Sequence, residues 1–155
     1  MSNDNILPEI KNWKLREVIN DVEVLSKDSV AYKENIISNL RLPPFSKFTG
    51  STLTITDIEW SKMFHHYKFF LDDKEESLIE KAFRNSELSL YNKIILIYNS
   101  DNLVVKIPIE LFFKDWEGFT RSQLWEGLIF SDDFKLIMET SRDYYFHSNF
   151  KIWHK

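Results

Sequence analysis

The stretch from Trp125 to Trp153 constrains the fold of this chain most, because its apolar and aromatic residues follow the pattern of paired strands. Two arms, Phe134–Thr140 and Tyr144–Trp153, suit a pleated and half-buried surface, and a short polar break separates them. Successive side chains of a strand alternate between its faces. The sequence therefore predicts a β-hairpin with an apolar face that includes Phe146 and a wet, aromatic face that includes His147.

A second hairpin is indicated upstream. The run Lys93–Tyr98 is continuously apolar after its first residue, too short for a stable helix and rich in β-branched residues. Turn-forming residues 99–102 follow it, and Leu103–Ile107 then reads as the partner strand. Pro108 lacks a backbone N–H, so we expect it to end the pairing or to lie at a sheet edge.

The first half has helical periodicity. Apolar residues recur at about helical spacing in Pro8–Leu25 and Ser29–Leu40, and Pro43 and Pro44 close the second helix. Thr56 and Glu59 have the spacing of a capping box. That box predicts a third helix, whose apolar stripe comprises Trp60, Met63, Phe64 and Tyr67. A fourth helix is expected after Asp72 or Asp73, with Leu78, Ile79, Ala82 and Phe83 on its buried side.

Helices followed by strands predict an α+β fold, with N-terminal helices packed on one face of a C-terminal antiparallel sheet. The length of 155 residues fits a single domain, 1–155. The segment Ile109–Gln123 stays ambiguous between helix and loop. Thr120 is a possible cap of a helix over Ser122–Ile129. The Asp132–Asp133 pair is expected to form the turn between Leu128–Phe130 and the strand that begins at Phe134.

Composition excludes several classes of protein. The absence of cysteine rules out disulfides and thiol nucleophiles, and the net charge of −4 argues against direct nucleic-acid binding. Residues 1–10 do not resemble a secretory signal, and no apolar run is long enough to span a membrane. We therefore expect a cytoplasmic protein that does not bind membranes.

Candidates for chemistry are few. Adjacent residues such as His65 and His66 point about 100° apart on a helix, which is a poor arrangement for one metal ion. His147 and Tyr145 share a strand face, near Glu139 or Asp143 if the hairpin register permits, and such a trio could support acid–base catalysis. With three glycines and none of the phosphate-binding loop motifs, the chain indicates no cofactor, and no metal or catalytic residue is assigned.

Acidic residues alternate with tryptophans between Glu110 and Asp133, where six acids (Glu110, Asp115, Glu117, Glu126, Asp132 and Asp133) accompany two bases (Lys114 and Arg121). Tryptophan is favoured as an interface anchor, and surrounding acids would steer the chain toward a basic partner. Trp116 and Trp125 are equally compatible with positions in the core.

The acidic and aromatic run Ile109–Phe134, beside two hairpins in a compact chain without cysteine, resembles the bacterial immunity proteins of contact-dependent growth inhibition and related polymorphic toxin systems. The resemblance implies a protein that binds a cognate toxin domain, a basic nuclease in our expectation, and blocks its active site. The residues expected to contact it are Glu110, Asp115, Trp116, Glu117, Trp125, Asp132 and Asp133. Two alternatives stay open: a small enzyme or ligand-binding domain using His147, Tyr145 and a nearby carboxylate, and a homodimeric interaction module built on the last strand. The sequence leaves monomer and dimer unresolved.

Overall fold

A seven-stranded antiparallel sheet forms the centre of the computed structural model, which describes residues 10, 13–40, 58, 60–70, 76–98, 103–121, 127–140 and 145–152. The strand order is β1-β4-β3-β5-β6-β7-β2. The strands are β1 (Glu23–Ser26), β2 (Tyr67–Phe70), β3 (Lys93–Tyr98), β4 (Leu103–Pro108), β5 (Gly127–Ser131), β6 (Ile137–Thr140) and β7 (Tyr145–Ser148). The α-helices are α1 (Trp13–Val18), α2 (Ser29–Leu40), α3 (Glu76–Arg84), α4 (Ile109–Lys114) and α5 (Trp116–Arg121), and the 3₁₀ turns are η2 (Ile19–Asp21), η3 (Trp60–Lys62) and η4 (Glu87–Leu90).

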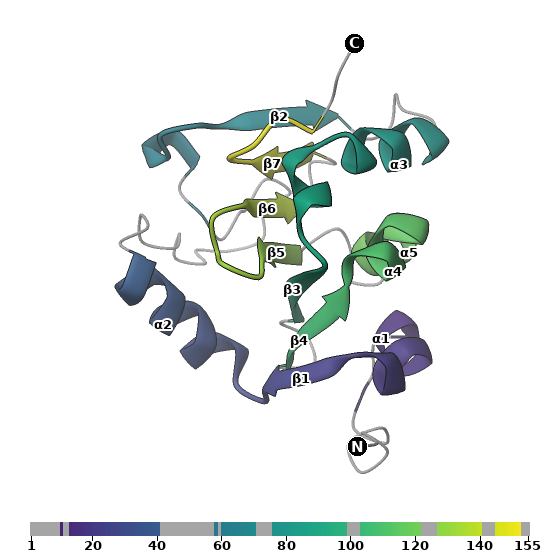
Figure 1. Cartoon of the computed structure of the whole chain (residues 1–155). Coiled ribbons are helices and arrows are strands. Elements are labelled where there is room, and N and C mark those ends of the chain that lie inside the picture. The colour runs from purple at the N-terminus through teal and green to yellow at the C-terminus, as the bar shows by residue number, and fades with distance from the viewer. Residues whose placement is uncertain are drawn as a thin grey trace.

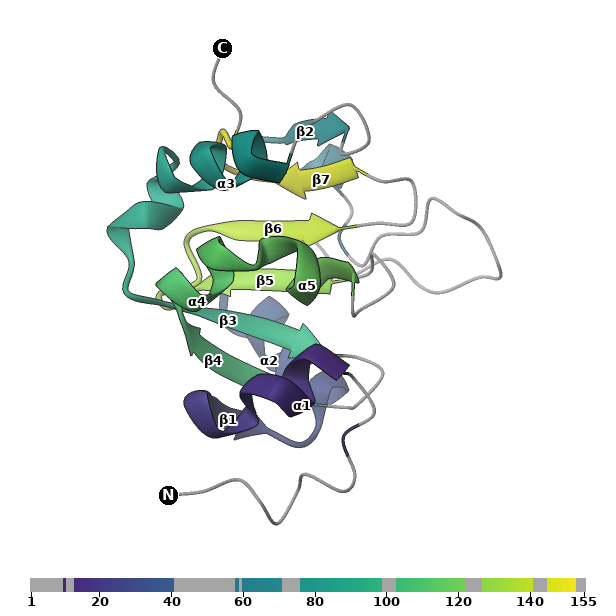
Figure 2. The ribbon, with the colours of Figure 1, turned by 90° about the vertical axis from the view of Figure 1, so that its right-hand side faces the viewer.

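Helices lie on both sides of the sheet (Figure 1). On one face, α1, α3, α4 and α5 cover a core that includes Ile94, Leu96 and Phe146 (Figure 2). On the other face, α2 and the segment around η3 cover a smaller core that includes Ile95 and Ile97. Neighbouring residues of β3 thus enter different cores, because side chains alternate along a strand.

The α+β class is confirmed, and so are both predicted hairpins. β3 pairs with β4 from Lys93↔Pro108 to Tyr98↔Leu103, and Pro108 ends the pairing as expected. β6 pairs with β7, with Glu139 opposite His147. Both C-terminal strands are shorter than the predicted arms.

Two helices of the first half were also predicted correctly. α2 has the expected bounds, and its first turn is capped by Asp28, whose side chain accepts a hydrogen bond from the Ala31 N–H at 3.1 Å. α3 buries Ile79, Ala82 and Phe83, whereas Leu78, expected on its buried side, is exposed. The expected caps Asp72 and Asp73, the capping-box residues Thr56 and Glu59, and Pro43 and Pro44 lie outside the described residues.

Two other helix predictions were wrong. Within Pro8–Leu25, the α-helix ends at Val18 and Glu23–Ser26 forms β1, which pairs with β4. The expected helix through Trp60 and Tyr67 is a single 3₁₀ turn followed by β2, which pairs with β7. In both places, hydrogen bonding to a distant strand overrides the local helical pattern. Both outer strands of the sheet therefore come from the first half of the chain.

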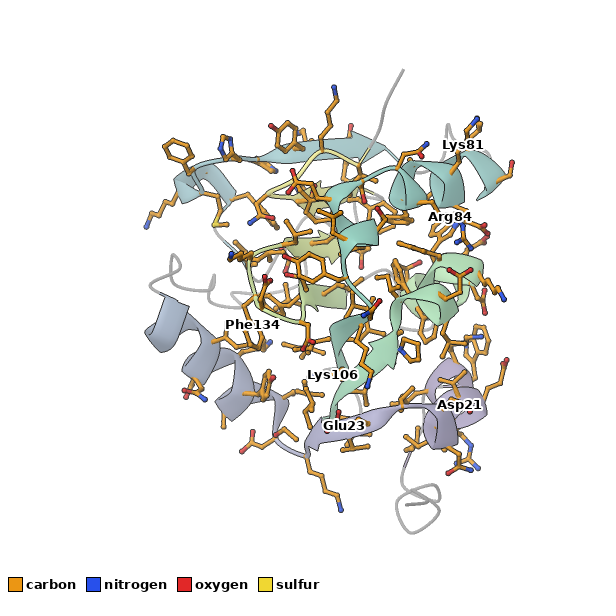
Figure 3. All side chains as sticks on the ribbon, in the orientation of Figure 1. Asp21, Glu23, Lys81, Arg84, Lys106 and Phe134 are labelled. Atoms are coloured by element: carbon orange, nitrogen blue, oxygen red, sulfur yellow. The ribbon has the colours of Figure 1, made fainter. Side chains whose placement is uncertain are left out.

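The Asp132–Asp133 pair forms the predicted turn between β5 and β6. Ser131 Oγ donates to Asp133 Oδ1 at 2.8 Å and accepts from the Leu136 N–H at 2.8 Å. Phe134 follows at a positive φ of 63°, a rare conformation for a bulky residue. The Phe134 ring, labelled in Figure 3, is partly buried and packs against Phe130 and Tyr32 at the border of the smaller core.

Candidate partner-binding surface

The acids expected to form one face belong to two separate groups. Asp115 and Glu117 lie in the helical layer, where Asp115 forms an ion pair with the buried Lys14 and caps α5 by accepting from the Gly118 N–H at 3.2 Å. Burial lowers the pKa of Lys14, but hydrogen bonds and charge from Asp115 and Glu17 outweigh burial, so the pKa is raised overall. Asp115 therefore has a structural role.

Glu110, at the start of α4, and Asp132 and Asp133, in the β5–β6 turn, belong to elements at the same end of the strands (Figure 2). Glu110 accepts two hydrogen bonds from the Arg84 guanidinium, at 2.8 and 2.9 Å, and these bonds lower the pKa of the Glu110 carboxyl. Lys106 forms an ion pair with Asp132, with 2.8 Å between Lys106 Nζ and Asp132 Oδ1.

Asp133 accepts hydrogen bonds from the Tyr91 hydroxyl at 2.9 Å and from the Lys135 N–H at 3.0 Å. Glu110, Asp132 and Asp133 thus each have a cation or a hydrogen-bond donor within the chain, and these three residues form no uncompensated acidic face.

The expectation for Trp116 is corrected. Its side chain is 4% exposed and its ring packs against Phe83 and Phe146 in the larger core. A partner cannot reach it while the chain is folded. Trp125, the other predicted anchor, lies outside the described residues, as does Asp143.

Polar side chains instead meet on the other face of the sheet, across β6, β7 and β2. Glu139, His147 and Lys68 are consecutive cross-strand neighbours, so all three project from this face. Glu139 and His147 are 2% and 7% exposed, so the face expected to be wet is buried at these two positions.

The carboxylate of Glu139 fixes the segment that precedes β2. Its Oε1 accepts hydrogen bonds from Trp60 Nε1 at 2.9 Å and from the Ile58 N–H at 3.4 Å. The Trp60 ring in turn lies nearly parallel to the rings of His66 and His147, at 5.2 and 6.0 Å between centroids. The buried carboxylate of Glu139 thus holds η3 against the sheet, although η3 and β6 are far apart in the sequence.

His66 and His147 add a second link between this segment and β7. His66 Nε2 lies 3.1 Å from His147 Nδ1, and the ring centroids are 5.3 Å apart. The two nitrogens therefore lie between the centroids, close to the line that joins them. The two rings therefore meet edge to edge, as in an N–H···N hydrogen bond. Such a bond needs one protonated and one bare nitrogen, so it is lost when both rings are cationic.

We expect this pair to make stability depend on pH. Burial, followed by the charge of Lys68, lowers the pKa of His66 below its ordinary 6.5. A histidine whose folded pKa is lowered contributes stability above the unfolded value, and that stability is lost as the pH falls through the folded value. The urea midpoint should therefore fall between pH 7 and pH 5.5, and it should fall less in His66→Gln. Equal losses in both proteins would contradict this prediction.

Three exposed rings lie at the start of β2 and just before it. We call these residues, Phe64, His65 and Tyr67, the β2 aromatic surface. Phe64 is 93% exposed and Tyr67 is 42% exposed. The His65 ring packs edge-on against Phe64 at 4.7 Å and nearly parallel to Tyr67 at 6.4 Å. The sequence pattern had placed Phe64 and Tyr67 in a helix core with Trp60. Nothing in the sequence pattern distinguished a strand with exposed rings from such a helix.

Among the described residues, no three histidine, aspartate or glutamate side chains are arranged to hold a metal ion. No helix in the described ranges is both long and apolar enough to span a membrane. Similarity to other proteins adds no assignment, since no model of a known family, no curated sequence and no solved structure compared with this chain matches it.

Proposed function

We propose that this protein is an immunity protein that binds a cognate toxin domain, covers its active site and contacts it through the β2 aromatic surface. The partner class follows from the resemblance of the run Ile109–Phe134. The observation that carries a binding function is the exposure of Phe64 beside Tyr67. Contiguous exposed aromatic side chains are characteristic of protein interfaces, and aromatic residues dominate binding energy there.

The contacts beneath this surface support the proposal. Trp60 and His66, on either side of Phe64, are held by Glu139 and His147. Binding costs less conformational entropy when the contacting segment is already fixed. Phe64 is thus presented on an ordered segment.

Charge acts at longer range. The chain carries a net charge of −4, which favours encounter with a basic domain such as a nuclease. Because Glu110, Asp115 and Asp132 are ion-paired within the chain, we assign them to stability, and we assign the contact itself to aromatic residues.

The enzyme alternative has weaker support. Glu139 and His147 are opposite each other, as acid–base chemistry on this face would require, with Tyr145 beside His147 at 6.2 Å between ring centroids. However, both are buried and Trp60 packs over His147. A substrate would have to displace that ring.

We expect Phe64→Ala to weaken binding of the cognate toxin domain by about 2 kcal/mol, roughly thirtyfold in Kd. The toxin domain is used with its active site disabled, and binding is measured by calorimetry. Growth protection against the active toxin should fall in parallel.

Leu90→Ala provides the matched control, because Leu90 is 82% exposed but lies on η4, away from β2. It should bind as the unmodified chain does. Equal losses in both variants, or a loss only in Leu90→Ala, would show that β2 is not the contact. Failure of the unmodified chain to bind would remove the toxin-directed proposal.

A further inference from the structure

The two edges of the sheet differ in their capacity to accept another strand. β1 is paired with a register shift between Val24 and Ser26, and such irregularities protect an edge from further pairing. β2 pairs with β7 through four consecutive residues without a shift. In the described residues, nothing pairs with the outer side of β2, so its backbone is a regular edge.

A lysine, Lys68, marks this edge. The Lys68 ammonium lies over the Tyr145 ring, 5.0 Å from its centroid, and the described part of the chain places no carboxylate within ion-pair distance of it. The only other charged residue between positions 60 and 70 is Lys62. The edge and the β2 aromatic surface thus combine apolar rings with positive charge.

We propose that β2 is extended by a strand from the partner protein, and that this strand carries an aspartate or glutamate opposite Lys68. This inference rests on the proposed function and adds the chemistry of the contacting segment. Backbone hydrogen bonds supply affinity in strand addition, and side chains opposite the edge supply specificity. Oppositely charged cross-strand neighbours stabilise such a pair. A partner with an overall basic surface can present such a segment.

A second copy of this chain is a poorer occupant. Lysine on an edge strand opposes pairing between identical edges, because it brings like charges together. An acidic strand removes that penalty. We therefore expect the chain alone to sediment as a monomer at micromolar concentration, and a dimer that Lys68→Glu disrupts would overturn the inference.

The test uses a displayed library of random short peptides, selected against the intact chain and against two variants. The unmodified chain and Lys114→Glu, which makes the same charge change on the exposed surface of α4, should enrich peptides with alternating apolar residues around an acid. Lys68→Glu should enrich peptides with lysine or arginine instead, and bind the original acidic peptides roughly tenfold more weakly. Selection of the same peptides by all three proteins, or peptides without acids for the unmodified chain, would overturn the inference.

Amide hydrogen exchange locates the bound peptide. Addition of the best acidic peptide should slow exchange within Tyr67–Phe70, because amide groups of an open edge acquire hydrogen-bond partners. Protection of the helical layer without protection of β2 would contradict strand addition.

The two proposals fail separately. If acidic peptides protect β2 but the toxin domain does not bind, the toxin-directed function is wrong and the strand-addition site stands. If the toxin domain binds through Phe64 while Lys68→Glu affects neither its affinity nor the selected peptides, the function stands and the strand-addition site is wrong.

Discussion

Replacement of Trp116 by alanine is expected to lower the free energy of unfolding by about 3–5 kcal/mol, the usual loss for a large aromatic side chain removed from a core. Trp116 is 4% exposed, and its ring lies 6.1 Å from that of Phe83 and 5.9 Å from that of Phe146. Alanine would leave a cavity between α5, α3 and β7. Urea unfolding followed by circular dichroism measures the loss.

Trp13→Ala is the matched control, since Trp13 is 53% exposed on α1. Its effect should stay within about 0.5 kcal/mol, as for most surface substitutions. The comparison separates the two roles that the sequence left open for Trp116. A Trp116→Ala variant with normal stability and impaired partner binding would return Trp116 to the interface.

Glu139→Ala should cost about 2–4 kcal/mol, because it leaves the buried Trp60 Nε1–H and the Ile58 N–H without their acceptor. Glu139→Gln keeps an amide oxygen at the same place and should cost less. The effect should also be local, with faster hydrogen exchange in residues 60–70 than in β3 and β4.

A double-mutant cycle tests the physical cause. In a Trp60→Phe background the indole N–H is already absent, so Glu139→Ala should cost less than it does in the unmodified chain. Equal costs in the two backgrounds would show that the Trp60 hydrogen bond contributes nothing measurable. In that case Glu139 would not fix η3, and the β2 aromatic surface would lose its proposed support.

These two predictions concern opposite faces of one sheet. The face that contains Trp116 is filled with aromatic rings and supplies stability. The face that contains Glu139 includes a buried network of polar side chains. Burying such a network destabilises the fold unless each of its polar groups is hydrogen-bonded. Its benefit is placement: Glu139 and His147 hold the segment that carries Phe64, so loss of either should weaken partner binding through the order of that segment.

The elements that could be predicted from sequence are those whose pattern and tertiary environment agree. The apolar run Lys93–Tyr98 is buried on both faces in the structure, at residues 94–97, as expected of a central strand. α2 begins after its capping aspartate and needs no distant contact to define its start. The alternation of Phe146 and His147 gave the two faces of β7 correctly.

Only the tertiary structure decided the features that depend on contacts between residues far apart in the sequence. Glu23–Ser26 and Tyr67–Phe70 have apolar spacing that suits a helix, but β4 and β7 offer each of them an open strand edge. Whether Trp116 is buried depends on how α5 packs on the sheet, because its ring is covered by Phe83 of α3 and Phe146 of β7. The approach of Trp60 to Glu139 joins residues 79 positions apart. Local sequence determines which conformations a segment can adopt, whereas the surface it meets after folding determines which one is stable and which side chains stay exposed.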